Sequence, residues 1–188
     1  MRGKFLVFTC VIVSILFGGC LNEENKINSY EYNTQDIIED FNNTSIVSNI
    51  SELEVALKES YSITLKNDIT SNNNLIMEGE FSKTDTREEH KVINMRRNLN
   101  IFYIDSSNNI ISNFILKAPN LVIKSRDVTI KGGKFIGNIY VESSGFTLND
   151  SKVDGDIYFK NEEVKQSFKL ENTANVSGKI EIKEYDKG

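Results

Sequence analysis

An imperfect internal repeat in the second half of the chain limits its possible folds more than any other feature. Three segments, residues 135–141, 152–159 and 175–182, share the order apolar-x-Gly-x-Ile-x-apolar, with the first spacer missing in the earliest copy. A second apolar strand precedes each copy, at residues 128–130, 146–148 and 168–170. Strands that recur with no helix between them predict a solenoid, in which each layer of strands stacks on the next.

The spacing of the repeat predicts which side chains lie above one another. The glycines at 137, 155 and 178 are 18 and then 23 residues apart, and each allows a sharp bend without a Cβ clash. The core stacks expected are Ile139, Ile157 and Ile180, with Val141, Phe159 and Ile182 beside them. Their neighbours point outward, because side chains alternate along a strand. These outward positions are Asn138, Tyr140, Asp156, Tyr158, Lys179 and Glu181.

The same register is predicted to continue backward through Val122 and Ile104. The longer last interval places its extra residues in the charged stretch Lys160–Gln166, which is predicted to be a loop. Asn, Asp, Ser and Gly cluster between the strands, as is typical of turns.

A short helix is predicted ahead of the first strand. Ser51 and Glu54 fit a capping box with Ser51 as the N-cap, and Ile50 with Val55 fits the accompanying hydrophobic staple. The apolar spacing that follows predicts an amphipathic helix over Glu52–Ser60. Such a helix would cover the first layer of the stack.

From about Ser51 to Ile182, the chain resembles the right-handed parallel β-helix proteins of the pectin/pectate-lyase-like superfamily. It also resembles clostridial lipoproteins in the spacing Ala-Pro-x-Leu at residues 118–121 and Gly-Gly-x-Phe-x-Gly at 132–137. The resemblance implies an all-β fold, a single-stranded right-handed parallel β-helix of about six or seven coils with a short N-terminal capping α-helix. It implies little about function, because one fold serves many functions.

The first twenty residues predict secretion and lipid attachment. A basic start is followed by an apolar run over residues 5–17 and then by Gly18-Gly19-Cys20, which is the pattern of a secretory signal. Its end resembles the lipobox of bacterial lipoproteins, which implies cleavage before Cys20 and a diacylglyceryl group on that cysteine. The alternative is an ordinary signal peptide that contains a cysteine. Cysteine usage favours the lipoprotein, because the only other one, Cys10, lies in the removed segment.

Three regions follow from this interpretation. Residues 1–19 are the lipoprotein signal peptide, residues 20–47 are a lipid-anchored flexible tether, and residues 48–188 are the β-helix domain. The tether is rich in Asn and acidic residues and cannot bury enough apolar surface to offset its ordering entropy. The expected location is the cell membrane, lipid-anchored on its extracytoplasmic face.

Charge excludes some partners. Without residues 1–19 the chain has 20 basic and 27 acidic residues. An acidic domain is a poor nucleic-acid binder, because phosphate contacts need clustered Lys and Arg. The membrane contact is therefore assigned to the acyl anchor, and charged residues near the end of the last strand, such as Glu181, Lys183 and Glu184, favour a monomer.

The lyases of the pectin/pectate-lyase-like superfamily use aspartates that bind Ca²⁺ and a basic residue that abstracts a proton. The candidate bases are Arg96, Arg97 and Arg126, and the candidate carboxylates are Asp150, Asp154 and Asp156. The aspartates fall at turn or outward positions, and Arg96-Arg97 fits a surface pair. His90, in the charged loop Glu80–His90, would supply only half of a metal site. The sequence therefore predicts no catalytic set, metal or cofactor, although it leaves enzymatic activity open.

Three functions remain as hypotheses. The first is a non-catalytic β-helix on the cell surface that binds or scaffolds, with Tyr140 and Tyr158 stacking on the sugar rings of a cell-wall or extracellular glycan. The alternative for these tyrosines is that they only cover the sheet surface. The second hypothesis is a small or degenerate polysaccharide lyase, and the third is self-assembly through the uncovered last coil.

Overall fold

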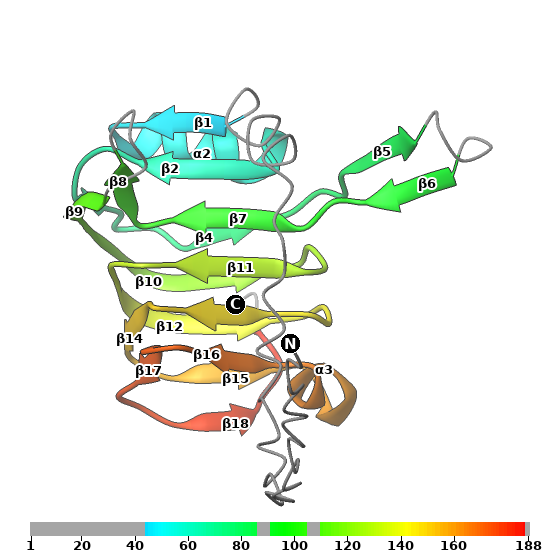
Figure 1. Cartoon of the computed structure of the whole chain (residues 1–188). Coiled ribbons are helices and arrows are strands. Elements are labelled where there is room, and N and C mark those ends of the chain that lie inside the picture. Colours follow the sequence, from blue (N-terminus) through cyan, green and yellow to red (C-terminus); the bar gives the residue numbers. More distant parts are fainter. Residues whose placement is uncertain (1–43, 86–90, 105–109, 187–188) are drawn as a thin grey trace, which may run out of the picture. The chain divides into compact units, whose positions relative to one another are not determined.

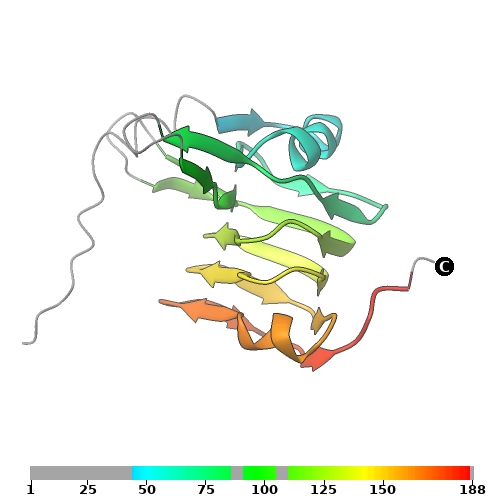
Figure 2. The same ribbon diagram turned by 90° about the vertical axis from the view of Figure 1, so that its right-hand side faces the viewer.

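The computed structural model describes residues 44–85, 91–104 and 110–186 (Figure 1). These residues are mostly β-strands in two parallel sheets, and along most of the chain its path passes from one sheet to the other and back (Figures 1 and 2). The predicted all-β class is therefore confirmed. Among the described residues, no helix is long and apolar enough to span a membrane.

Sheet A holds one strand of each layer. Its order is β1 (Thr44–Val47), β2 (Ser62–Leu65), β7 (Arg97–Asn100), β11 (Val128–Lys131), β13 (Thr147–Asn149) and β16 (Lys169–Glu171). Sheet B consists of β3 (Ile69–Thr70), β4 (Leu75–Met77), β10 (Ile115–Ile123), β12 (Lys134–Val141), β14 (Lys152–Asp154), β15 (Ile157–Phe159), β17 (Asn175–Val176) and β18 (Ile180–Ile182).

The core is made of identical or similar side chains stacked from strand to strand. Ile139 of β12 pairs with Ile157, which pairs with Ile180, and the first two are fully buried. The second predicted stack is Val141, Phe159 and Ile182. In sheet A the corresponding stack is Ile63, Leu99, Ile130, Leu148 and Leu170. Full burial of one such side chain contributes about 1.5–3 kcal/mol. The predicted stacking of the repeats is confirmed.

The backward extension of the repeat was wrong. Leu121 pairs with Ile139, and Val122 pairs with Tyr140 on the outer face. The register shifts within β10 between Lys117 and Asn120, and a shift of one residue turns a side chain to the other face. Ile104 leaves the stack altogether, because it lies in β8 (Phe102–Ile104), which pairs antiparallel with β9 (Ile110–Asn113).

The repeated glycines are required where the strands of sheet B bend. Gly137 has a φ of +133° and Gly155 a φ of +154°. A Cβ at Gly137 would overlap the carbonyl oxygen of Ala118, and one at Gly155 would overlap that of Gly137. Each bend therefore packs directly on the bend of the neighbouring strand, which explains why the motif repeats glycine and no larger residue.

The predicted helix is present as α2 (Ile50–Glu59), with a different N-terminus. The N-cap is Asn49, whose Oδ1 accepts from the N–H of Glu52 at 3.0 Å. The Glu52 carboxylate in turn accepts from the N–H of Ser48 at 2.7 Å. The prediction of Ser51 as N-cap was wrong, because Asn49 caps the helix two residues earlier, and the Glu52 carboxylate bonds to the residue before the cap, not to the cap itself.

The helix buries the face that the sequence predicted. Leu53, Ala56 and Leu57 are buried, whereas Val55 is 55% exposed, so the predicted staple with Ile50 does not form. The helix contacts β1, β2 and β4, the strands of the first layers.

Part of the predicted tether is folded. Thr44–Val47 lies within the range 20–47, and it forms β1, which pairs in parallel with β2. Paired backbone groups and the buried side chain of Val47 explain its order. The remainder of that range, and the signal segment 1–19, lie outside the described residues.

Two predicted loops contain secondary structure. Within Glu80–His90, β5 (Ser82–Asp85) pairs antiparallel with β6 (Lys91–Asn94), and residues 86–90 lie outside the described residues. Within Lys160–Gln166, α3 (Glu162–Gln166) begins after the N-cap Asn161 and buries Val164. Both insertions follow a strand of sheet B and precede one of sheet A, and they lie on the same side of the stack in Figure 1.

Candidate binding face on sheet B

The two outward tyrosines predicted from the repeat lie on the outer face of sheet B, the side opposite the core. Tyr140 of β12 pairs with Tyr158 of β15, and their ring centroids are 4.9 Å apart with an interplanar angle of 35°. This spacing is close to the distance of about 4.8 Å between neighbouring strands. We call these two residues the tyrosine ladder. Both are half-buried.

A row of polar side chains runs beside the tyrosine ladder. Asn120 Nδ2 donates to Asn74 Oδ1 at 2.8 Å, and Asn138 Nδ2 donates to Asn120 Oδ1 at 3.5 Å. Asn138 Oδ1 in turn accepts from the backbone N–H of Asp156 at 3.1 Å. We call this row, Asn74, Asn120, Asn138 and Asp156, the amide ladder. The row crosses four strands. Asn74 and Asp156 immediately precede β4 and β15, and Asn120 and Asn138 lie within β10 and β12.

Residues that follow β18 lie against both ladders. We call Lys183–Asp186 the C-terminal tail. The Tyr185 ring meets Tyr140 edge-on with centroids 5.0 Å apart, and its hydroxyl oxygen accepts from Asn74 Nδ2 at 2.9 Å. Lys183 Nζ lies 4.8 Å from the centroid of the Tyr158 ring, a cation–π contact. Lys183 and Tyr185 therefore occupy part of the outer face of sheet B.

Hydrogen bonds fix the charge state of the face. The Tyr158 hydroxyl donates to Asp156 Oδ2 at 2.7 Å, and this bond raises the pKa of Tyr158 to about 12. Asp156 also accepts from the backbone N–H of Lys179 at 2.7 Å. The Lys179 bond, followed by the Tyr158 bond, holds the pKa of Asp156 below its usual value. At neutral pH Asp156 is therefore an ionised acceptor and Tyr158 a protonated donor.

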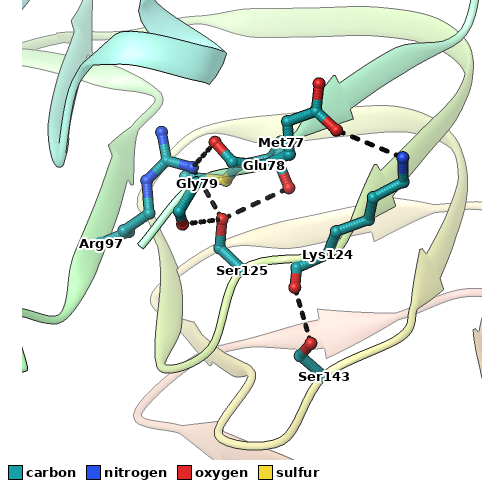
Figure 3. Close-up of polar contacts among 7 residues, drawn as sticks. All are labelled: Met77, Glu78, Gly79, Arg97, Lys124, Ser125 and Ser143. Atoms are coloured by element: carbon teal, nitrogen blue, oxygen red, sulfur yellow. Dashed lines mark hydrogen bonds and ion pairs between the residues drawn. The ribbon is translucent and has the colours of Figure 1, made fainter. Parts of the chain in front are cut away.

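The candidate base Arg97 has a structural role, and its prediction as a surface residue was wrong. It is the first residue of β7, it is 1% exposed, and its guanidinium points toward Glu78 and Ser125 (Figure 3). Its guanidinium donates to the carbonyl oxygens of Leu57 at 3.0 Å and Ser60 at 2.6 Å, at the C-terminus of α2. It also donates to Glu78 O at 2.9 Å and to Ser125 Oγ at 2.8 Å.

These contacts explain how a cation is tolerated in the core. The carbonyl groups at a helix C-terminus carry partial negative charge, which favours a cation there. The Phe81 ring centroid lies 4.8 Å from the guanidinium carbon and adds a cation–π contact. Burial lowers the pKa of Arg97 to about 10, so the side chain stays charged at neutral pH. Arg97 thus ties the helix to the sheet and cannot reach a substrate.

The other candidate catalytic residues do not converge. Asp150 accepts from Thr173 and Asn172, Asp154 from Ser177, and Asp156 from Lys179 and Tyr158. Across residues 44–85, 91–104 and 110–186, no group of three His, Cys, Asp or Glu side chains is placed to hold a metal ion. His90, which the sequence offers as only half of a metal site, and Cys20 lie outside the described residues.

The two remaining arginines lie near the hairpin of β5 and β6. Arg96 is exposed, as predicted. Arg126 is also exposed and lines a small open pocket of about 110 Å³ together with Phe81, Arg97 and Asp127. The pocket is far smaller than the roughly 300–1,000 Å³ typical of small-molecule sites.

The fold and this face define an all-β protein of stacked parallel strands with an aromatic and amide-lined outer surface. Comparison with known proteins gives no match: no family model, curated protein or solved structure is similar enough to assign a family.

The repeat placed Asn138, Tyr140, Asp156 and Tyr158 on the outer face, and other members of this face were missed. Asn120 stands 18 residues before Asn138, so the repeat period could have placed it on the outer face. It was missed because Val122, not Leu121, was assigned to the core stack with Ile139. Asn74 and Tyr185 had no such signal, because their contact joins residues 111 positions apart. Tail residues outside a periodic pattern cannot be placed from sequence spacing.

Proposed function

We propose that this chain is a non-catalytic binding module, a right-handed parallel β-helix held on the extracytoplasmic face of a bacterial cell membrane by a diacylglyceryl group on Cys20. The observation that carries the binding function is the pairing of an aromatic row with a polar row on the outer face of sheet B. Tyr140 and Tyr158 stand 4.9 Å apart, next to the linked side chains of Asn74, Asn120 and Asn138.

This combination suits a glycan better than other ligands. An aromatic ring packs against the apolar C–H face of a sugar, and such ring contacts contribute about 0.5–1.5 kcal/mol beyond burial for aromatic partners. Each amide has two donors and a carbonyl acceptor, so it can bond to a sugar hydroxyl while keeping its neighbour in the row. A regular ladder across four strands would present the same contact to successive units of a repeating polymer.

The proposed right-handed winding rests on a general rule for parallel strands, and the proposed lipid anchor rests on the sequence. A connection between parallel strands of one sheet is right-handed in about 98% of cases, and the strands of each layer join the sheets in one repeating order. The anchor rests on the resemblance of Gly18-Gly19-Cys20 to a lipobox. Two acyl chains give stable attachment where a single chain gives only marginal binding.

A polysaccharide lyase is disfavoured by the geometry. Arg97, one of the three candidate bases, is bonded inside the core, and Asp150, Asp154 and Asp156 each bond to different neighbours. A lyase needs these groups to converge on one sugar unit.

Self-assembly is the second candidate, because the last layer is partly open. Leu170 of β16 is 49% exposed and Ile182 of β18 is 48% exposed. Free strand edges can pair with another chain. We expect a monomer, since charged residues flank this edge, and light scattering of the soluble chain from Asn22 onward tests it. A stable oligomer at micromolar concentration would favour assembly instead.

The test of binding is a pull-down of the soluble chain with immobilised cell-wall glycan and with polygalacturonate. The double variant Tyr140→Ala/Tyr158→Ala should lose about tenfold in retention, which corresponds to about 1.4 kcal/mol. Tyr103→Ala is the matched control, because Tyr103 lies in the separate β8–β9 pair. Equal retention of the double variant and the control would rule out the tyrosine ladder as the site.

The test of the anchor is a cell fractionation of a Cys20→Ala variant. Loss of the acyl group should move the protein from the membrane fraction to the soluble fraction. A variant that is cleaved and still stays on the membrane would contradict lipid attachment at Cys20.

A further inference from the structure

The C-terminal tail leaves the sheet and turns along the outer face. The backbone N–H of Lys183 still donates to Phe159 O at 2.9 Å, so the ladder of β18 extends one residue past Ile182. The chain then rises beside the stack toward the earlier strands, as Figure 2 shows at its C-terminal end.

The Tyr185 side chain contacts residues on both sides of β10. Its partner Tyr140 lies in β12 and its partner Asn74 immediately precedes β4, and β10 lies between these strands. The β10 residue at this level is Val122, which pairs with Tyr140 on one side and with Ile76 on the other. Val122 is 0% exposed although it belongs to the outer register. The Tyr185 ring contacts residues on both sides of the strand that holds Val122, Tyr140 in β12 and Asn74 just before β4.

Individually weak contacts hold Tyr185 and Lys183 to the face. They are an edge-on ring contact, a hydrogen bond and a cation–π contact, and each of these is weak on its own. Fixing the backbone of this segment costs conformational entropy, which opposes such contacts, so the tail can leave without disturbing the buried stacks.

The position of Tyr185 imitates a ligand. Its ring packs against the tyrosine ladder while its hydroxyl bonds to the amide ladder, which are the two contacts that a sugar ring with a hydroxyl group would make. We infer that the C-terminal tail is a displaceable strap that competes with glycan for the tyrosine ladder, with Tyr185 as the residue that closes it. The choice of glycan as the competing ligand rests on the proposed function. The closure itself rests on the tail contacts alone.

When the tail closes the site in most molecules, the apparent affinity for a ligand falls in proportion to the fraction of molecules whose site is open. Removing the Tyr185 ring should therefore strengthen binding. We expect about a tenfold lower dissociation constant for Tyr185→Ala, equivalent to about 1.4 kcal/mol, and a smaller gain for Tyr185→Phe, which keeps the ring and loses the bond to Asn74. Glu184→Ala is the matched control within the tail.

Two measurements on the soluble chain from Asn22 to Gly188 separate the strap from its ligand. The first is nitration of Tyr140 and Tyr158, followed by mass spectrometry, which needs no glycan. The second is titration with soluble cell-wall glycan fragments and with polygalacturonate. The strap predicts at least threefold faster nitration of Tyr140 in Tyr185→Ala than in the control, together with tighter glycan binding.

The other outcomes are distinct. Faster nitration without glycan binding by any variant would support the strap and overturn the proposed function. Unchanged nitration with glycan binding that ignores Tyr185 would overturn the strap and leave the proposed function standing. Unchanged nitration and no binding would overturn both. Thermal unfolding of each variant confirms that it is folded, and Tyr185→Phe provides the test if Tyr185→Ala is not.

Discussion

The two ends of the strand stack are closed in different ways. At the first layers, α2 packs on β1, β2 and β4, and the buried guanidinium of Arg97 bonds to the carbonyl groups at its C-terminus. At the last layer, no described helix covers the edge of β18, and Leu170 and Ile182 remain half exposed. The segment that follows β18 lies along the side of the stack instead, against the tyrosine ladder.

The two ends of this strand stack therefore differ in how strongly they are held. The first end is closed by several buried hydrogen bonds to one charged group, which are costly to break. The last end is bordered by a few surface contacts that a ligand can replace. We therefore expect stability to concentrate at the first end and conformational change at the last.

The largest effect is expected at the first end. Arg97→Ala should lower the free energy of unfolding by about 3–5 kcal/mol, because buried carbonyl oxygens lose their donor at about 1–3 kcal/mol each. Urea unfolding followed by circular dichroism measures this. The neighbouring exposed residue provides the control: Arg96→Ala should change the free energy of unfolding by no more than about 0.5 kcal/mol. Similar values for the two variants would show that Arg97 does not lock the helix.

A second experiment compares two leucines of one stack. Leu148→Ala should cost about 2–5 kcal/mol, as is usual for a buried leucine, because Leu148 is 0% exposed. Leu170 pairs with it in the last layer and is 49% exposed, so Leu170→Ala should cost about 1 kcal/mol. The same urea unfolding measures both. A loss at Leu170 as large as that at Leu148 would indicate that the last layer is covered in solution, as self-assembly would require.

The smallest effect is expected from acid, through two carboxylates of the last layers. Bonds from the Thr173 N–H and hydroxyl lower the pKa of Asp150, and the bond from the Lys179 N–H lowers that of Asp156. Each carboxylate therefore stabilises the fold above the unfolded-state pKa of about 3.9, and this contribution is lost as the pH falls through the lower folded-state pKa.

Urea unfolding at pH 6, 4 and 3 measures this acid dependence. The double variant Asp150→Asn/Asp156→Asn should be slightly less stable at pH 6 and should lose less stability on acidification than the parent chain. Arg97 keeps its charge throughout this range, so its contribution at the first end should not change. A parent and a double variant with identical pH dependence would show that neither carboxylate contributes.

The repeat period predicted the regular part of the fold because each layer there obeys one pattern. Ile139, Ile157, Tyr140 and Tyr158 stack as expected, since a twofold alternation assigns every residue to the core or the outer face. The prediction failed at β10, where Ala118 and Pro119 shift the register, and at Arg97, whose burial depends on the carbonyl groups of a helix far away in sequence. Tyr185 could not be placed for the same reason, because its partners come from other layers.

One corner of the fold accepts connections of very different length. Between sheet B and the next strand of sheet A, the chain uses residues 124–127 and 142–146 in two layers, residues 160–168 with α3 in another, and residues 78–96 with the β5–β6 hairpin in a fourth. The stacks above and below keep their register in every case. Because closing a longer loop costs only about 0.6 kcal/mol for each doubling of its length, this corner is a natural attachment point, where a foreign peptide or a small domain could be grafted without altering the frame that carries it.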